Sequence, residues 1–212
     1  MTLANAKVRA RALIADGEAF TFWMYLDSVS QVTIGYGTMM PNAASAQSVD
    51  LRHADKKRAS DGEKAAEWVR LRALSAAGTA LNFSAGHYRK DARLFITHDE
   101  GERLMLLKLD AFIADLRKIY AKFDTFPEDA QVALMDMIYN LGWRVKTVFV
   151  NFSKAINDPA GPDWKLAASR SRRPQLSDAR NRMVRDLFLA AARTHELERR
   201  NRPGAPVRVP SI

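Results

Sequence analysis

Apolar residues recur at helical spacing over much of the chain. Behind Thr97 they follow one another at intervals of three and four residues, the period of a single buried helix face. This pattern predicts a long helix over residues 98–123. The residues that carry it are Leu106, Leu109, Ile113, Leu116, Tyr120 and Phe123.

Other helices are predicted from looser apolar periods and from capping signals. Ser60, Thr97 and Thr125 each precede a Glu by three residues, the form of a capping box at a helix start. The predicted helices cover 3–17, 63–77, a stretch from Thr125 to Gly142, 146–157, 163–171 and 177–200. The first of them would bury a face made of Leu3, Val8, Ala12 and Ala15.

Residues 20–37 have a different pattern, rich in aromatic and β-branched side chains, which favours strands. Residues 39–60 are polar and without a period, which predicts a long loop, and the tail 201–212 holds three prolines. We expect one α+β domain over 1–212, mostly helical. A small β-containing lobe over 18–95 and a helical lobe over 96–200, with the 1–17 helix packed on the latter, would flank a cleft, followed by a loose tail over 201–212.

The composition of the chain excludes several kinds of functional site. The chain has 212 residues and no Cys, which excludes disulfide scaffolds, thiol nucleophiles and thiolate zinc sites. No apolar run approaches the ~20 residues of a membrane span, and the N-terminus lacks the apolar core of a secretory signal. We therefore expect synthesis in the cytoplasm without a signal peptide and no membrane insertion.

The net charge is +9, and most of it lies in the C-terminal segment, where residues 170–212 hold eleven Arg against four acids. Arginine suits planar oxyanions. Nucleic acid, anionic lipid and an acidic polymer such as peptidoglycan are the candidate partners at this point.

Common nucleotide, metalloprotease and hydrolase motifs are absent, and the four His show no ligand spacing, so no metal or cofactor is expected. Paired carboxylates remain. Glycoside hydrolysis needs a carboxylic acid that protonates the leaving oxygen and a second, ionised carboxylate. Glu18, beside an aromatic cluster, and Asp27, in a polar turn, have the contrasting surroundings that this pair requires.

The run from Glu18 to Gly37 resembles the active-site segment of phage-type lysozymes. Asp27 follows Glu18 by nine residues and Thr33 follows Asp27 by six, inside the Y-x-D and T-I-G-x-G frame of that family. Later segments are similar to the family in the same order, and the resemblance covers about 18–37 and 96–190. These segments are Ile96–Leu104, Ala133–Gly142, Asp163–Ala168, Arg180-Asn181 and Phe188.

The resemblance implies a muramidase that hydrolyses the β-1,4 bond between N-acetylmuramic acid and N-acetylglucosamine in peptidoglycan. Glu18 would be the general acid, Asp27 the ionised partner, and Thr33 the residue that positions the attacking water. Tyr139 and Asn140 match cleft-lining, substrate-binding positions. Arg180 matches a basic position that faces the acidic substrate.

The chain also departs from the family. Thr38 stands where many relatives have His, Ser30 stands where the hairpin often has Gly, and residues 39–95 are longer than in the simplest members. That region looks more like the muramidase domains of pesticin and of type VI secretion effectors. The protein would act in the periplasm or on the cell wall of a target bacterium, as an endolysin or as an effector with a cognate immunity protein or secretion component as partner.

Two other classes stay open. One is a catalytically inactive lysozyme-like module that binds peptidoglycan or a partner protein. The other is a basic, helical nucleic-acid-binding protein, which the Arg-rich C-terminus suggests. The leading interpretation includes no nucleic acid partner.

Overall fold

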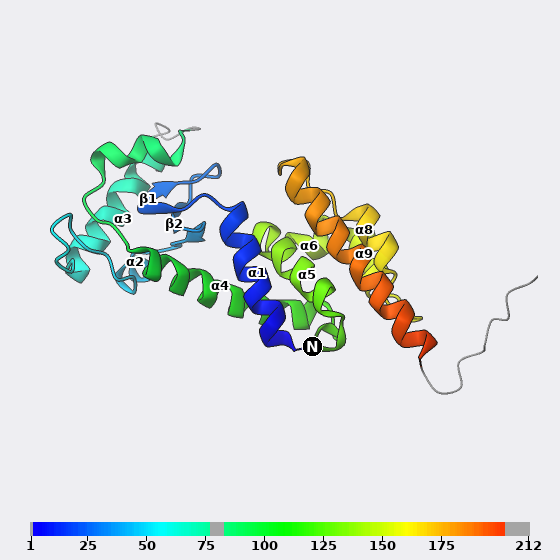
Figure 1. Cartoon of the computed structure of the whole chain (residues 1–212). Coiled ribbons are helices and arrows are strands. Elements are labelled where there is room, and N and C mark those ends of the chain that lie inside the picture. Colours follow the sequence, from blue (N-terminus) through cyan, green and yellow to red (C-terminus); the bar gives the residue numbers. More distant parts are fainter. Residues whose placement is uncertain (1, 77–82, 202–212) are drawn as a thin grey trace, which may run out of the picture. The chain divides into compact units, whose positions relative to one another are not determined.

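The computed structural model describes residues 2–76 and 83–201. This part of the chain is mostly helical with one three-stranded antiparallel sheet, so the predicted α+β class is confirmed (Figure 1). The chain divides into two units. The sheet unit is Ile14–Leu109, and the helical unit holds the residues up to Leu13 and from Asp110 onward. The predicted lobe over 18–95 lies inside the sheet unit.

Two helices cross the division between the units: α1, Leu3–Gly17, and α4, His98–Ile119. The remaining elements belong to one unit each. The sheet unit holds β1 (Thr21–Leu26), β2 (Val32–Gly35), β3 (Thr38–Met39), α2 (Ala43–Gln47), α3 (Asp61–Ala76) and the 3₁₀ helix η1 (Ala85–Asp91). The helical unit holds η2 (Phe123–Thr125), α5 (Glu128–Leu141), α6 (Arg144–Thr147), α7 (Val150–Ile156), α8 (Trp164–Arg170) and α9 (Asp178–Arg200).

The sheet has the order β1-β2-β3, with both pairs antiparallel. Tyr25 pairs with Thr33, but Thr21 pairs with Gly35, so four residue steps of β1 lie against two of β2. Such an irregularity bends a strand and redirects its side chains, and it is common beside active sites. It separates the start of β1, next to Glu18, from the end that carries Asp27.

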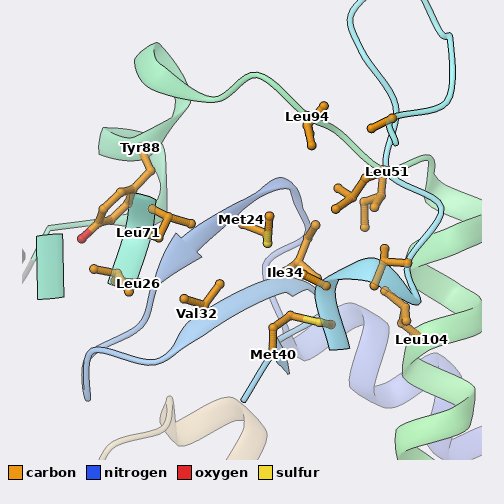
Figure 2. Packing of buried hydrophobic residues seen from close by; sticks show 14 residues of the cluster. Met24, Leu26, Val32, Ile34, Met40, Leu51, Leu71, Tyr88, Leu94 and Leu104 are labelled. Atoms are coloured by element: carbon orange, nitrogen blue, oxygen red, sulfur yellow. The ribbon is translucent and has the colours of Figure 1, made fainter. Parts of the chain in front are cut away.

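The core of the sheet unit forms on one face of this hairpin. Met24 and Leu26 of β1 and Val32 and Ile34 of β2 alternate along their strands and are at most 1% exposed. Figure 2 shows these side chains facing Leu71 of α3, Tyr88 of η1 and Leu104 of α4. Burying an apolar side chain of this size stabilises the folded state by about 1.5–3 kcal/mol. The hairpin that carries Asp27 and Thr33 is thereby fixed to the helices around it.

The buried face of α1 differs from the prediction. Ala6, Ala10 and Ile14 are fully buried, whereas Val8 is 63% exposed. The three buried residues lie four apart, on one row of the helix, while the predicted step from Leu3 to Val8 is five residues and leaves that row. The predicted bounds 3–17 agree with the structure.

The segment 39–60 is not the featureless loop that was predicted. It contains β3 and α2, and the latter begins at a capping box in which Asn42 and Ser45 bond reciprocally. Arg52 also forms bridges with Arg58 and with Phe95. A five-residue helix is too short to reveal a period in the sequence, which explains the error.

The capping predictions have mixed outcomes. Ser60 and Glu63 form the full box at the start of α3, and Thr97 accepts the N–H of Glu100 at 3.2 Å. The box at Thr125 is wrong, because its hydroxyl donates to Lys122 O and closes η2, while Pro127 caps α5.

Several helix ends differ from their predicted positions. α4 stops at Ile119 rather than 123, and the predicted helix 146–157 is the two short helices α6 and α7. α5 ends before Gly142, as predicted, where φ is +56°. The predicted end of the 63–77 helix and most of the tail 201–212 lie outside the described residues.

The first turns of α4 lie against the segment that links Glu18 to β1. Gly101 of α4 leaves no room for a side chain, because a Cβ there would overlap the ring of Phe20. The same ring stacks on His98 with centroids 4.3 Å apart and lies 4.8 Å from the ring of Tyr36. Ile96 N–H donates to Phe22 O at 2.8 Å, which extends this contact to the strand. Two residues after Glu18, the chain is therefore held by α4.

Gly101→Ala should lower the free energy of unfolding by about 1–3 kcal/mol, because the added methyl forces the Phe20 ring out of its stack. Urea denaturation measures the change. Gly62→Ala, in the first turn of α3, is the matched control, since its Cβ would meet nothing within 4 Å. Equal urea midpoints for the two variants would contradict this account.

Candidate active site

Glu18 follows the last residue of α1 and extends its hydrogen bonding. Its N–H donates to Ile14 O at 2.9 Å, and the residue is half-buried. Its charge acts on two side chains of the sheet unit, Tyr25 of β1 and Lys108 of α4. The charge of Glu18 therefore acts on a strand and a helix of the same unit, and its role as the general acid stays a prediction.

Asp27 directly follows β1 and organises the turn to β2. Its Oδ1 accepts the N–H groups of Val29 at 3.0 Å and Gln31 at 2.9 Å, and its own N–H donates to Gln31 O. This is an Asx-type turn, in which the side chain takes over backbone bonding. Ser30, in the same turn, has φ +59°, a conformation that glycine adopts more easily. One carboxylate oxygen of Asp27 is thus fixed by the turn.

The second oxygen of Asp27 faces Thr33. The buried Thr33 hydroxyl lies 3.4 Å from Asp27 Oδ2 and 3.2 Å from Gln31 O, and it can donate to either. Thr33 stands directly opposite Tyr25 in the β1–β2 pairing, which brings the two side chains to the same face. The six-residue spacing between Asp27 and Thr33 therefore closes one turn and brings a hydroxyl to a carboxylate.

Tyr25 links the two carboxyl groups electrostatically. Burial, followed by the negative charges of Asp27 and then Glu18, raises the pKa of Tyr25 to about 12. The phenol is consequently neutral at physiological pH. The charges of both predicted carboxyls act on this one phenol, and both residues belong to the sheet unit.

Lys108 is a cation at the same place. Its Nζ donates to Gly37 O at 2.7 Å, immediately after β2. Burial lowers the pKa of Lys108 to about 8, and the negative charge of Glu18 partly opposes that effect. Lys108 remains mostly protonated at neutral pH.

The structure brings together three of the six predicted site residues. Glu18, Asp27 and Thr33 belong to the sheet unit, and Tyr139, Asn140 and Arg180 belong to the helical unit. Tyr139 is 5% exposed and packs edge-on to the ring of Phe112. Asn140 is half-buried and accepts a long bond of 3.4 Å from Gln175. Substrate contacts at Tyr139 and Asn140 stay predictions.

Arg180 takes part in a buried cluster of the helical unit. Asp136, fully buried in α5, accepts from Arg180 at Oδ1 and from Arg173 at Oδ2, both at 2.7 Å. A buried carboxylate needs such partners, because an unpaired charge away from water is costly. Arg180 is thus engaged by Asp136 within its own unit, and a role facing the substrate stays a prediction.

The C-terminal arginines are not uniformly exposed. Arg173 and Arg180 are buried in that cluster, whereas Arg172, Arg182 and Arg185 line a cavity of about 340 Å³ at the start of α9. Asp178, in the same lining, pairs weakly with Arg172 at 3.4 Å. Part of the positive charge of residues 170–212 is therefore used inside the fold, in the cluster around Asp136.

Residues 2–76 and 83–201 contain neither a cluster of metal ligands nor a helix suited to a membrane. In these ranges no three side chains among His, Asp and Glu come together as a metal site would need. Within the same ranges, none of the helices combines the length and apolar character that crossing a bilayer would take.

Lys108 and Tyr25 are the site residues that the sequence prediction missed. Lys108 had a detectable signal, because it lies between Leu104 and Leu109 in an otherwise apolar stripe of α4. A cation on a buried helix face needs a partner, and that partner was not visible from spacing alone. For Tyr25, the sequence shows Asp27 two residues away, but it does not show that the charge of Glu18 acts on the same phenol.

Comparisons with models of protein families and with curated proteins yield no match. The likeness to phage-type lysozymes accordingly rests on the residues of this chain.

The free energy of unfolding should rise with pH because of the titration of Lys108. Burial lowers its pKa from 10.5 to about 8 in the folded chain, so the unfolded chain binds more protons there between these values. The free energy of unfolding, relative to that of Lys108→Met, should rise by about 3 kcal/mol from pH 8 to 10.5. Urea unfolding at both ends of that range measures it, and curves that stay parallel would refute it.

Proposed function

We propose that this chain is a muramidase that cleaves the β-1,4 bond between N-acetylmuramic acid and N-acetylglucosamine in peptidoglycan. The observation that carries the proposal is that Asp27 and Thr33, which the resemblance pairs, meet across the β1–β2 turn in the same unit as Glu18. Glu18 and Asp27 both act on Tyr25, and the Thr33 hydroxyl lies 3.4 Å from Asp27 Oδ2.

Each of these three residues has its own role in the proposed reaction. Glu18 gives its proton to the glycosidic oxygen as the bond to the sugar carbon breaks. Asp27 stabilises the positive charge that develops on the sugar or orients the water that attacks it. The turn holds Asp27 through Oδ1, which leaves Oδ2 and the Thr33 hydroxyl as the pair that can bind this water.

The proposed function also includes the place where the enzyme acts. The substrate would be the wall of a bacterium, reached from the periplasmic side or from outside. A phage endolysin and a secreted antibacterial effector use the same chemistry, and only an effector requires a cognate immunity protein in the producing cell. A basic protein suits this anionic polymer, because opposite charge raises the rate of encounter.

Glu18→Gln should reduce fragment release from purified peptidoglycan by about 10²–10⁴-fold, the usual contribution of a general acid. Mass analysis of the released fragments gives both the rate and the bond cleaved. Asp16→Asn is the matched control, because it neutralises an exposed carboxylate two residues away and should keep full activity. A folded Glu18→Gln protein that releases fragments at the wild-type rate would refute the assignment.

Asp27→Asn tests the second carboxyl. The amide oxygen of Asn can still accept the N–H groups of Val29 and Gln31, so the turn should survive while the charge is lost. Fragment release should fall by about 10²-fold or more with little change in thermal stability. Peptidoglycan binding with no fragment release, by the wild type as well, would instead favour the inactive binding module.

A further inference from the structure

A lysine is an unusual residue for position 108 of α4. The residue is only partly exposed, and Leu104, Met105 and Leu109, its neighbours on α4, are buried. A buried ammonium group lowers stability unless polar partners compensate, and an apolar side chain would fill the same space more favourably. Packing alone therefore gives no reason for a lysine at this position.

Two interactions connect Lys108 to the candidate site. Its Nζ donates to Gly37 O at 2.7 Å, at the end of the T-I-G-x-G run that also contains Thr33. The charge of Glu18 acts on the same ammonium. One cation thus touches the segment that carries Thr33 and senses the carboxyl of the proposed acid.

The geometry of α4 accounts for this placement. Lys108 follows Gly101 by seven residues, two turns along the same helix face. Gly101 receives the ring of Phe20, which lies two residues after Glu18. A single face of α4 therefore holds the chain beside Glu18 at one end and presents an ammonium group at the other.

We propose that Lys108 is a positioning residue of the active site, which anchors the end of β2 through Gly37 and stabilises the carboxylate of Glu18. This inference rests on the proposed function, in which Glu18 is the general acid. When Glu18 gives its proton to the leaving oxygen, the carbon–oxygen bond breaks with its electron pair on that oxygen, and Glu18 becomes an anion. A fixed cation beside that anion lowers the free energy of the transition state.

Tyr25 and Asp27 are two other ionisable groups of the neighbourhood, and His98 and Tyr36 lie against the ring of Phe20. Tyr25, on β1, is neutral at physiological pH because its pKa is about 12. Asp27, in the turn, uses Oδ1 for two backbone N–H groups and faces Thr33 with Oδ2. Lys108, on α4, supplies the positive charge that acts together with Glu18.

A spectroscopic titration tests the coupling without relying on activity. In the wild type, the ¹³Cε resonance of Lys108 should titrate with a midpoint near 8. In Glu18→Gln that midpoint should move to lower pH, because the negative charge that raises the pKa of Lys108 is gone. An unchanged midpoint would overturn the inference, whether or not the protein cleaves peptidoglycan. A shifted midpoint in a protein that releases no fragments would support the coupling and sink the proposed function instead.

Kinetics on a soluble peptidoglycan oligomer test the role in catalysis. Lys108→Met should lower kcat by at least about tenfold with little change in KM, and Lys108→Arg should restore part of it. Lys108→Gln keeps a hydrogen-bond donor without the charge, so it should fold like the wild type and still lose kcat.

Lys64→Met is the matched control for these variants. Lys64 is another shielded lysine of the sheet unit, 12% exposed, and it donates to a backbone carbonyl, Gln47 O, at 2.9 Å. Its loss should leave kcat unchanged. If Lys108→Met and Lys64→Met have the same kcat once both are folded, Lys108 is a structural residue and the inference fails.

Discussion

The contact between Phe20 and Gly101 is the constraint on which the arrangement of the candidate site depends. An aromatic ring lies on helix backbone, and only the absence of a side chain at residue 101 permits it. This contact sets where the chain leaves α1, since Glu18 is two residues away. Lys108 lies two turns further along the same face of α4. One face of α4 therefore carries both the glycine that receives Phe20 and the ammonium group on which the charge of Glu18 acts.

The two units handle buried charge differently. In the helical unit, Asp136 is surrounded by Arg173 and Arg180 with short bonds to both of its oxygens, so its charge is matched internally. In the sheet unit, Lys108 donates to Gly37 O, and the charge of Glu18 acts on the same ammonium group. The cluster of the helical unit joins side chains of opposite charge, whereas Lys108 joins a helix to the backbone that follows β2.

The sequence predicted most of the fold because the long elements have strong local signals. α9 lies close to its predicted bounds, α3 begins close to its predicted start, and the end of α5 follows from Gly142. The failures are local: α2 is too short for a period, and the buried row of α1 consists largely of alanines, which give weak patterns. In the candidate site, the Asp27–Thr33 contact could be anticipated because a hairpin connects them. Lys108 could not, because its partners lie more than seventy positions away in the sequence.

The turn at Asp27 has a consequence for how such proteins can diverge. Between Asp27 and Thr33 the chain makes one turn and re-enters the sheet, and strand side chains alternate between faces. Loss or gain of a single residue there would send the hydroxyl to the opposite face of the hairpin. The six-residue spacing between Asp27 and Thr33 is therefore a constraint of the hairpin itself. Residues 39–60 follow the hairpin and bury Met40, Ala46, Val49 and Leu51 in the same core, so changes in that segment act on packing rather than on strand register.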